Sequence, residues 1–374
     1  MSFKKINAWF HLWFGLASGI IVLVLGITGC ILVFEQEIKS ISSPWLHADA
    51  AGRSLLPPSR IYAAAARVLP DKKIRSVWYH GENRTVHVSS NSDSLVYVDP
   101  YTAEVVAIAD HEDFFHIIEE GHFYLWLPVK IGQQVTGWGT LVFFLLLISG
   151  LILWCPKKWN KKGRDQSFRI RWKAKFKRVN YDLHNVLGFY SLIVAAVMAF
   201  TALMMSFSWF NGSVYWLAGG VENKRVEAVS DTLGNPKRDM LAQADKAWHK
   251  GIYEIAEHNP KEIIVGFPES AADAIYVCTD MFGGTWRDVY LDQYTLKELP
   301  ASNKRLREES PASFIRRINY GLHVGAIGEL PTKIIYFLAS LICASLPVTG
   351  FYIWWGRKRK ASRKKKLLPE LVKV

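Results

Sequence analysis

A long apolar run opens with the stretch Asn180-Tyr181-Asp182-Leu183-His184-Asn185-Val186-Leu187-Gly188-Phe189. Near the N-terminus, a second apolar run opens with Asn7-Ala8-Trp9-Phe10-His11-Leu12-Trp13-Phe14-Gly15-Leu16. The Asn, the His and the Gly of the two stretches coincide without a gap. Self-similarity of this kind indicates an internal repeat. The chain is therefore predicted to consist of two related halves.

Four apolar runs are long enough to cross a membrane. They extend over about residues 8–34, 132–155, 181–207 and 331–355. Each reaches or exceeds the ~20 residues that a helix needs to cross about 30 Å of hydrocarbon. The sequence therefore predicts an integral membrane protein with four transmembrane helices, in contact with the lipid bilayer.

The second and fourth runs also match each other. They end in Ser149-Gly150-Leu151-Ile152-Leu153-Trp154 and in Thr349-Gly350-Phe351-Tyr352-Ile353-Trp354. Upstream of each run comes a His followed by Leu-Pro: His122 precedes Leu127-Pro128, and His323 precedes Leu330-Pro331. Both helices of each half therefore take part in the repeat.

Positive charge is concentrated beside the apolar runs. The net charge is +13, and nearly half of the 46 Lys and Arg lie in three blocks: Lys4-Lys5, residues 157–178, and the tail from Arg357 onward. This distribution speaks against a soluble nucleic-acid binder and follows the rule that Lys and Arg stay cytoplasmic. We expect an inner-membrane protein with both termini in the cytoplasm and with residues 36–131 and 208–330 in the periplasm. The four Cys form no CxxC pattern, so neither a disulfide scaffold, a zinc finger nor covalent c-type haem attachment is indicated.

The two outer segments share a pattern of one helix followed by alternating, strand-like runs. Their last runs end alike, in Val96-Tyr97-Val98-Asp99-Pro100-Tyr101-Thr102 and in Val289-Tyr290-Leu291-Asp292-Gln293-Tyr294-Thr295. The expected fold is a four-transmembrane-helix bundle of two pseudo-symmetric halves with two extracytoplasmic α+β domains. The expected divisions are helix 1 (1–35), domain 1 (36–131), helix 2 (132–156), basic loop (157–180), helix 3 (181–207), domain 2 (208–330), helix 4 (331–356) and basic tail (357–374).

The sequence resembles the PepSY-associated transmembrane helix family over nearly its whole length. The resemblance rests on the Asp-Pro-Tyr-Thr strand end, on Leu183-His184-Asn185-Val186-Leu187-Gly188-Phe189-Tyr190, and on Leu346-Pro347-Val348-Thr349-Gly350-Phe351-Tyr352-Ile353-Trp354-Trp355. It implies that both outer domains are PepSY-like. Some members are haem-containing inner-membrane reductases that release iron from ferric siderophores, whereas for others the PepSY domains were proposed to regulate peptidases.

Four histidines stand at positions that the repeat relates. His11 and His184 lie at the inner ends of the first and third helices, and His122 and His323 lie before the outer ends of the second and fourth. Facing imidazoles in a helix bundle are what a six-coordinate haem iron requires. Zinc or copper would recruit Cys, carboxylates or a third His, and none is evident around His11. We therefore expect two b-type haems with bis-histidine ligation.

Membrane depth decides which histidines share a haem. His11 and His184 are expected to hold an inner haem, and His122 and His323 an outer one. For the outer haem, His116 or His111 is an alternative to His122, because both lie within twelve residues of it. The family pattern of a Leu before the even-helix His also holds at Leu322-His323 but not at Gly121-His122.

Two axial imidazoles leave no open coordination site, which favours electron transfer. With the family resemblance, this predicts an oxidoreductase that reduces a ferric siderophore at the outer face and releases Fe(II). The sequence has no NAD or flavin fingerprint, so the electron donor, a flavoprotein or a quinol, is expected to act in trans. The alternatives are a non-enzymatic PepSY-domain regulator or sensor that binds a peptide or protease and, less favoured, a metal permease.

Overall fold

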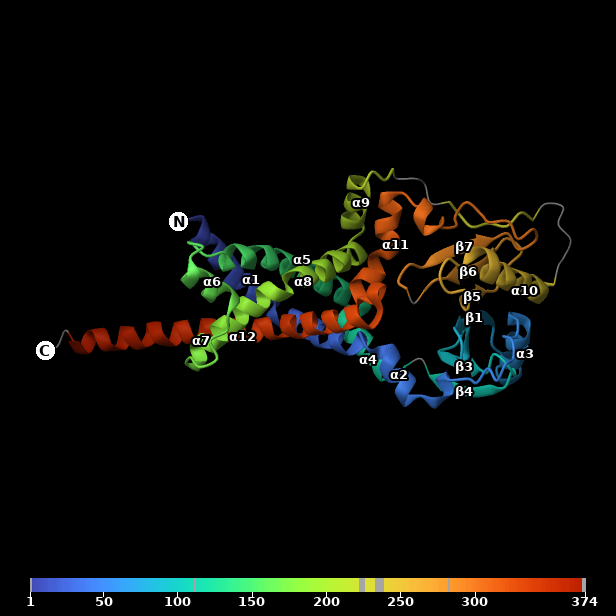
Figure 1. Cartoon of the computed structure of the whole chain (residues 1–374), viewed down its shortest axis with the longest axis horizontal. Coiled ribbons are helices and arrows are strands. Elements are labelled where there is room, and N and C mark those ends of the chain that lie inside the picture. The colour runs from blue at the N-terminus through green and yellow to red at the C-terminus, as the bar shows by residue number, and fades with distance from the viewer. Residues whose placement is uncertain (1, 111, 222–225, 233–238, 282, 372–374) are drawn as a thin grey trace.

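The computed structural model describes residues 2–110, 112–221, 226–232, 239–281 and 283–371, with side chains in the last helix up to Arg359. A helical bundle occupies one end of the molecule and a β-sheet the other, and both chain termini lie at the bundle end (Figure 1). We call the bundle end, which carries the Lys- and Arg-rich segments, the basic side, and the opposite end the sheet side.

Four helical segments are long and apolar enough to span a membrane: Phe3–Leu32, Val129–Trp154, Phe176–Ser206 and Ala326–Arg359. They correspond to α1 (Phe3–Leu32), to α5 (Val129–Trp154), to a composite of α7 (Phe176–Asp182), the π-helical η2 (Leu183–Leu187) and α8 (Gly188–Ser206), and to α12 (Glu329–Leu371). Helix α1 packs against α5 and α12, and α8 packs against the same two helices, so the four spans form a closed ring. The predicted four spans are confirmed.

Shorter helices connect the spans and the sheet. They are α2 (Glu35–Ser42), η1 (Pro44–Leu46), α3 (Pro58–Val68), α4 (Phe114–Tyr124), α6 (Lys161–Phe168), α9 (Ser208–Leu217), α10 (Met240–Lys250), η3 (Gly251–Ile255), η4 (Leu306–Glu308), α11 (Pro311–Val324) and η5 (Ala326–Gly328). Helix α4 packs on α1 and α5, and α11 packs on α8. Their N-termini are capped by side chains, since Asp113 accepts from the backbone N–H of His116 and Ser310 from that of Ser313.

The sheet has seven antiparallel strands in the order β4-β3-β2-β1-β5-β6-β7. The strands are β1 (Ile74–His80), β2 (Val86–Ser90), β3 (Ser94–Val98), β4 (Val105–Asp110), β5 (Glu262–Gly266), β6 (Ile275–Thr279) and β7 (Arg287–Leu291). At its centre β1 pairs with β5, with Val77 opposite Val265. The strands of the two outer segments therefore belong to one sheet.

One face of the sheet forms the apolar core. Side chains of a strand point alternately to opposite faces, and the set Val77, Val88, Val96, Val265 and Val277 is fully buried beneath α3 and α10. The two helices contact each other as well, since the backbone N–H and the hydroxyl of Ser59 both donate to the carboxylate of Asp245. This core ties the two halves of the chain together outside the bundle.

The sequence predicts two α+β domains, whereas the structure joins their strands in a single sheet. Either half alone would leave an edge strand with unpaired N–H and C=O groups, and the β1–β5 pairing satisfies both edges at once. Strand β4 was also not predicted. Its residues alternate between half-buried and exposed, with no buried member, so it lacks the strong apolar period of the other strands.

Candidate functional site

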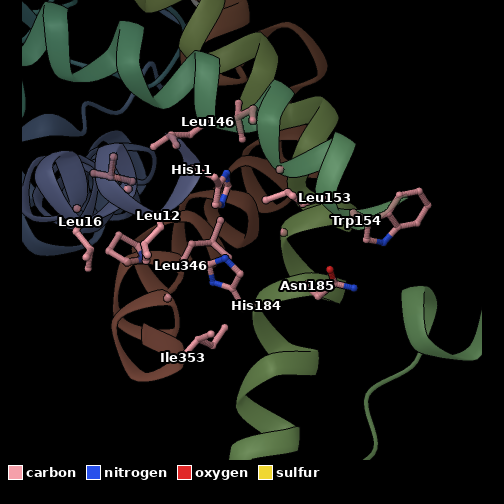
Figure 2. A pocket seen from close by; sticks show the side chains of 18 of the residues that line it. His11, Leu12, Leu16, Leu146, Leu153, Trp154, His184, Asn185, Leu346 and Ile353 are labelled. Atoms are coloured by element: carbon pink, nitrogen blue, oxygen red, sulfur yellow. The ribbon is translucent and has the colours of Figure 1, made fainter. Parts of the chain in front are cut away.

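His11 and His184 lie beside each other in the bundle. His11 belongs to α1 and His184 to the π-helical turn η2, and their ring centroids are 6.4 Å apart with the planes at 89°. Figure 2 shows the two rings next to each other among Leu12, Leu146 and Leu346. We call His11 and His184 the basic-side pair.

His122 and His323 form a second pair on the sheet side. They come from the short helices α4 and α11, and their ring centroids are 6.3 Å apart. His122, rather than its alternative His116 on the same helix, is the residue whose ring is placed beside His323. The other alternative, His111, lies outside the described residues. We call His122 and His323 the sheet-side pair.

The two pairs lie at different depths of the bundle. The sheet-side His122 contacts Thr28, which follows His11 by 17 residues on the same helix. At 1.5 Å per residue, the two positions are about 25 Å apart along α1. His11 and His122 therefore cannot share a ligand the size of one metal ion.

Each of the four imidazoles places its Nδ1 atom against a hydroxyl of the same half of the chain. The contacts are His11 with Ser149 at 2.6 Å, His184 with Thr349 at 2.9 Å, His122 with Thr28 at 2.9 Å and His323 with Thr201 at 3.0 Å. The hydroxyls of the basic-side pair belong to α5 and α12, and those of the sheet-side pair belong to α1 and α8. The same contact therefore occurs twice in each half.

These hydroxyls also determine the tautomer of the histidines. Each hydroxyl donates its single hydrogen to a backbone carbonyl of its own helix: Ser149 to Leu146, Thr349 to Ser345, Thr28 to Val24 and Thr201 to Val197. A hydroxyl that has donated its hydrogen can only accept at Nδ1. Each imidazole then carries its proton on Nδ1, and no described residue hydrogen bonds its Nε2. A neutral imidazole with a free Nε2 lone pair is the form that binds metal ions.

Corresponding contacts in the two halves position the two rings of the basic-side pair. Asn7 donates to the carbonyl oxygen of Ser149, and Asn180 donates to that of Thr349, both at 3.0 Å. The glycine after each hydroxyl residue lets the ring approach the helix. A Cβ on Gly150 would lie 3.2 Å from Cε1 of His11, and one on Gly350 would lie 3.3 Å from Cε1 of His184.

The ring spacing matches two imidazoles on opposite sides of one metal ion. A metal–imidazole bond is about 2.0 Å long, so trans nitrogens are about 4 Å apart and the ring centroids roughly 6 Å apart. The measured separations are 6.4 and 6.3 Å. Among the described residues, no group of three or more His, Cys, Asp or Glu could hold a metal ion by itself. The remaining ligands of an ion held there would have to be supplied by a cofactor such as haem.

A cavity of about 350 Å³ adjoins the basic-side pair. This volume lies within the range of about 300–1,000 Å³ that is usual for ligand pockets. Its wall is mostly apolar and includes Leu16, Leu146 and Leu153 (Figure 2). The repeat glycines Gly15 and Gly188 also line it, and no atom lies within 4 Å of where a Cβ on Gly15 would be. A flat, apolar molecule suits this space.

The hydroxyls and the π-helical turn were not predicted as parts of the site. A signal for the hydroxyls exists, because Thr28 and Thr201 each follow the aligned His by 17 residues. The departure at Gly121 has a steric reason, since a Cβ there would clash with the indole of Trp126. The π-helical turn at His184 has no counterpart at His11, and π-helical turns frequently occur at functional sites.

Four apolar spans and a sheet outside them define a multi-pass membrane protein with an attached antiparallel sheet domain. A family model, the PepSY-associated TM region, matches residues 8–357. The chain therefore belongs to this family, in agreement with the resemblance in its sequence. No curated protein matches the chain.

Proposed function

We propose that the protein is a di-haem reductase of the inner membrane, which passes electrons across the bilayer to a ferric siderophore in the periplasm. One observation carries this proposal: the bundle contains two histidine pairs at different depths. In each pair the ring spacing is that of two imidazoles that bind one metal ion. In this reading the two halves are pseudo-symmetric, and the strands of the sheet belong to two PepSY-like domains. The four histidines are the haem ligands.

The protein's own residues would hold and orient the cofactors. Haem held by these histidines would supply one-electron transfer. Ser149 and Thr349 accept the Nδ1 protons of His11 and His184 and so keep each Nε2 directed to the metal. Thr28 and Thr201 do the same for His122 and His323.

The direction of transfer follows from the charge distribution. The Lys- and Arg-rich segments lie at the bundle end of the basic-side pair, so this pair is assigned to the cytoplasmic side. A flavoprotein or a quinol gives up electrons there, and one electron reduces Fe(III) of the siderophore complex to Fe(II) on the sheet side. Fe(II) binds hard oxygen ligands more weakly and is released for uptake.

The visible spectrum of the detergent-purified protein tests the cofactor. We expect sharp α and β bands on reduction with dithionite. A colourless protein after expression with added haem would contradict the proposal and would make a regulator that binds a peptide or protease the better interpretation.

Reoxidation tests the reaction. Reduced protein in proteoliposomes should be reoxidised by a ferric siderophore and yield Fe(II), detected with a ferrous-specific chelator. His323→Ala should slow this reoxidation, whereas His184→Ala should block reduction from the basic side but not reoxidation of chemically reduced protein. Equal loss of both reactions in both variants would count against electron transfer between the pairs.

Labelling of an introduced cysteine tests the orientation. Lys162 is exposed on α6, and Cys155 is the exposed native cysteine. In a Cys155→Ser background, Lys162→Cys should react with an impermeant maleimide in inverted vesicles but not in intact spheroplasts. The opposite result would reverse the assignment of the two sides.

A further inference from the structure

The cavity beside the basic-side pair carries its permanent charge at one end, and Ser18 is the polar residue of its other end. Its described lining is apolar around Val22, Phe143 and Leu192, whereas Tyr181, Asn185 and Arg357 line it toward the basic side. Arg357 is the one permanently charged residue among those that line it. A ligand that fills this cavity should therefore be apolar over most of its surface and anionic at one edge.

Arg357 stands on the helix face that carries the basic-side site. It follows Gly350 by seven residues in α12, which is two helical turns and about 10.5 Å nearer the basic side. Side chains on a helix lean toward its N-terminus. The guanidinium of Arg357 therefore leans back toward Gly350 and His184 rather than away from the cavity.

Two neighbouring cations have partners of their own, and a third, Lys177 beside Gly356, does not line the cavity. Arg178 is paired with the fully buried carboxylate of Asp182 at 2.8 Å. The ammonium of Lys358 lies over the ring of Trp354. Arg357 makes no hydrogen bond or ion pair with the described residues, so its charge is available to a ligand.

The other half of the chain lacks this arrangement. The counterpart of Arg357, seven residues after Gly150, is Lys157. Helix α5 ends at Trp154, and the next residues, Cys155 and Pro156, turn the chain away, because proline disfavours helix in the residue before it. Gly356 stands in place of Pro156 in α12, which continues without a break. Lys157 and Arg357 are both exposed, but only Arg357 lines the cavity.

We propose that Arg357 binds the carboxylate groups of the cofactor in this cavity and fixes the cofactor with its carboxylate edge toward the basic side. The inference rests on the proposed function, because haem is a planar, apolar molecule with two carboxylates at one edge. A guanidinium matches a carboxylate geometrically, with two parallel N–H···O bonds. Tyr181 and Asn185 add polar groups at the same end of the cavity.

Uptake of haem and of its dimethyl ester tests this inference. The full chain, produced in a haem-deficient host, is reconstituted with either molecule, and release to apomyoglobin is then followed. Arg357→Gln should accelerate one of two release phases of haem by roughly tenfold, the effect of losing one charged hydrogen bond. Arg357→Lys should restore part of the retention. Lys157→Gln, which removes an equivalent positive charge at the same membrane face, should release haem like the wild type.

The dimethyl ester separates a carboxylate contact from a general weakening of the site. The ester has no carboxylates, so Arg357→Gln and the wild type should release it at the same rate. Equal release of haem from Arg357→Gln and Lys157→Gln would overturn the role of Arg357. The same holds if Arg357→Gln accelerates release of the dimethyl ester as much as it accelerates release of haem. A wild-type protein that takes up neither molecule would instead overturn the proposed function, and this inference with it.

Discussion

The bundle and the sheet each contain paired histidines, but the pairs differ in their spacing. In the sheet, Nε2 of His80 lies 2.8 Å from Nδ1 of His87, and the ring centroids are 4.9 Å apart. In the bundle, the centroids are 6.3 and 6.4 Å apart, and hydroxyls occupy the Nδ1 atoms. The rings of the sheet pair hydrogen bond to each other, whereas the centroids in each bundle pair are at the separation expected for two imidazoles that bind one ion.

The difference has a backbone origin. His80 and His87 lie on adjacent strands as diagonal neighbours, because the residue opposite His87 is Trp78. Diagonal neighbours on one face of a sheet are about 7–8 Å apart, which is still within reach of two rings that point toward each other. Helix axes pack about 8–10 Å apart, so facing side chains can enclose a third group. Substitution of a bundle histidine should therefore change cofactor binding, whereas substitution of a sheet histidine should change only the stability of the sheet.

The largest effect is expected from removing a bundle histidine. His184→Ala and His323→Ala should each lose about half of the bound haem, because two axial ligands are needed to hold each iron. His87→Ala should keep the full amount. Haem per chain is measured from the pyridine haemochrome spectrum. Loss of haem in His87→Ala, or full retention in both bundle variants, would remove the distinction between the two kinds of pair.

Removing the sheet pair should instead change how the stability of the sheet depends on pH. Burial, and then the nearby charge of Arg84, lower the pKa of His80 from 6.5 to about 4. Below pH 6.5 the unfolded chain therefore binds a proton that the folded sheet does not. The sheet should be fully stable above this pH and should lose up to about 3 kcal/mol as the pH falls to 4.

Thermal unfolding of the sheet, followed by circular dichroism across this pH range, measures the loss. His80→Gln cannot be protonated and should flatten the dependence on pH, whatever its own stability. His249→Gln, an exposed histidine on α10, serves as the control and should keep the wild-type slope. Equal slopes in all three proteins would show that His80 does not titrate in this way.

The sequence was sufficient to predict the spans and the related histidines, because both signals are local. Apolar length reveals the membrane helices, and the Asn-His-Gly spacing aligns His11 with His184. The pairing of β1 with β5 was not predictable in the same way, since these strands are separated by almost half the chain. Nothing in the alternation of one strand specifies its distant partner.

The hydroxyl partners of the histidines could not be predicted from the local sequence either. Ser149 and Thr349 stand in the quoted repeat, yet a hydroxyl in an apolar helix usually bonds only to its own backbone. Their second role depends on how α5 meets α1 and how α12 meets η2, which is a property of packing. The relative placement of Arg357 and Lys157 likewise depends on where a helix ends rather than on composition.

The hydroxyl contacts allow a finer test of the bundle pairs. Thr349→Val keeps the shape of the side chain but removes the acceptor for Nδ1 of His184. Loss of such a supporting contact typically weakens a metal site about 10–100-fold. Release of haem to apomyoglobin measures the change. Ser345→Ala is the matched control, because its hydroxyl donates only to the carbonyl of Ile342. Identical release from both variants would mean that the hydroxyl does not support the ligand.

The smallest effect is expected at the glycine behind the ring. Gly350→Ala would place a Cβ 3.3 Å from Cε1 of His184, so the ring must move by a few tenths of an ångström. A cost of about 1 kcal/mol, at the low end for overpacking, corresponds to roughly fivefold faster release. Gly212→Ala, where no atom lies within 4 Å of the new Cβ, should have no effect. An unchanged rate in Gly350→Ala would indicate that the ring is not held against this helix.

The central β1–β5 pairing bears on the ancestry of the chain. Antiparallel pairing of two corresponding strands is the contact that two identical subunits make across a twofold axis. A half-length chain could therefore assemble with a second copy of itself through the same strand edge. Duplication and fusion of its gene would turn this dimer into one polypeptide and free the halves to diverge. Such a history would account for the break at Pro156 and the uninterrupted helix at Gly356 as differences acquired after fusion.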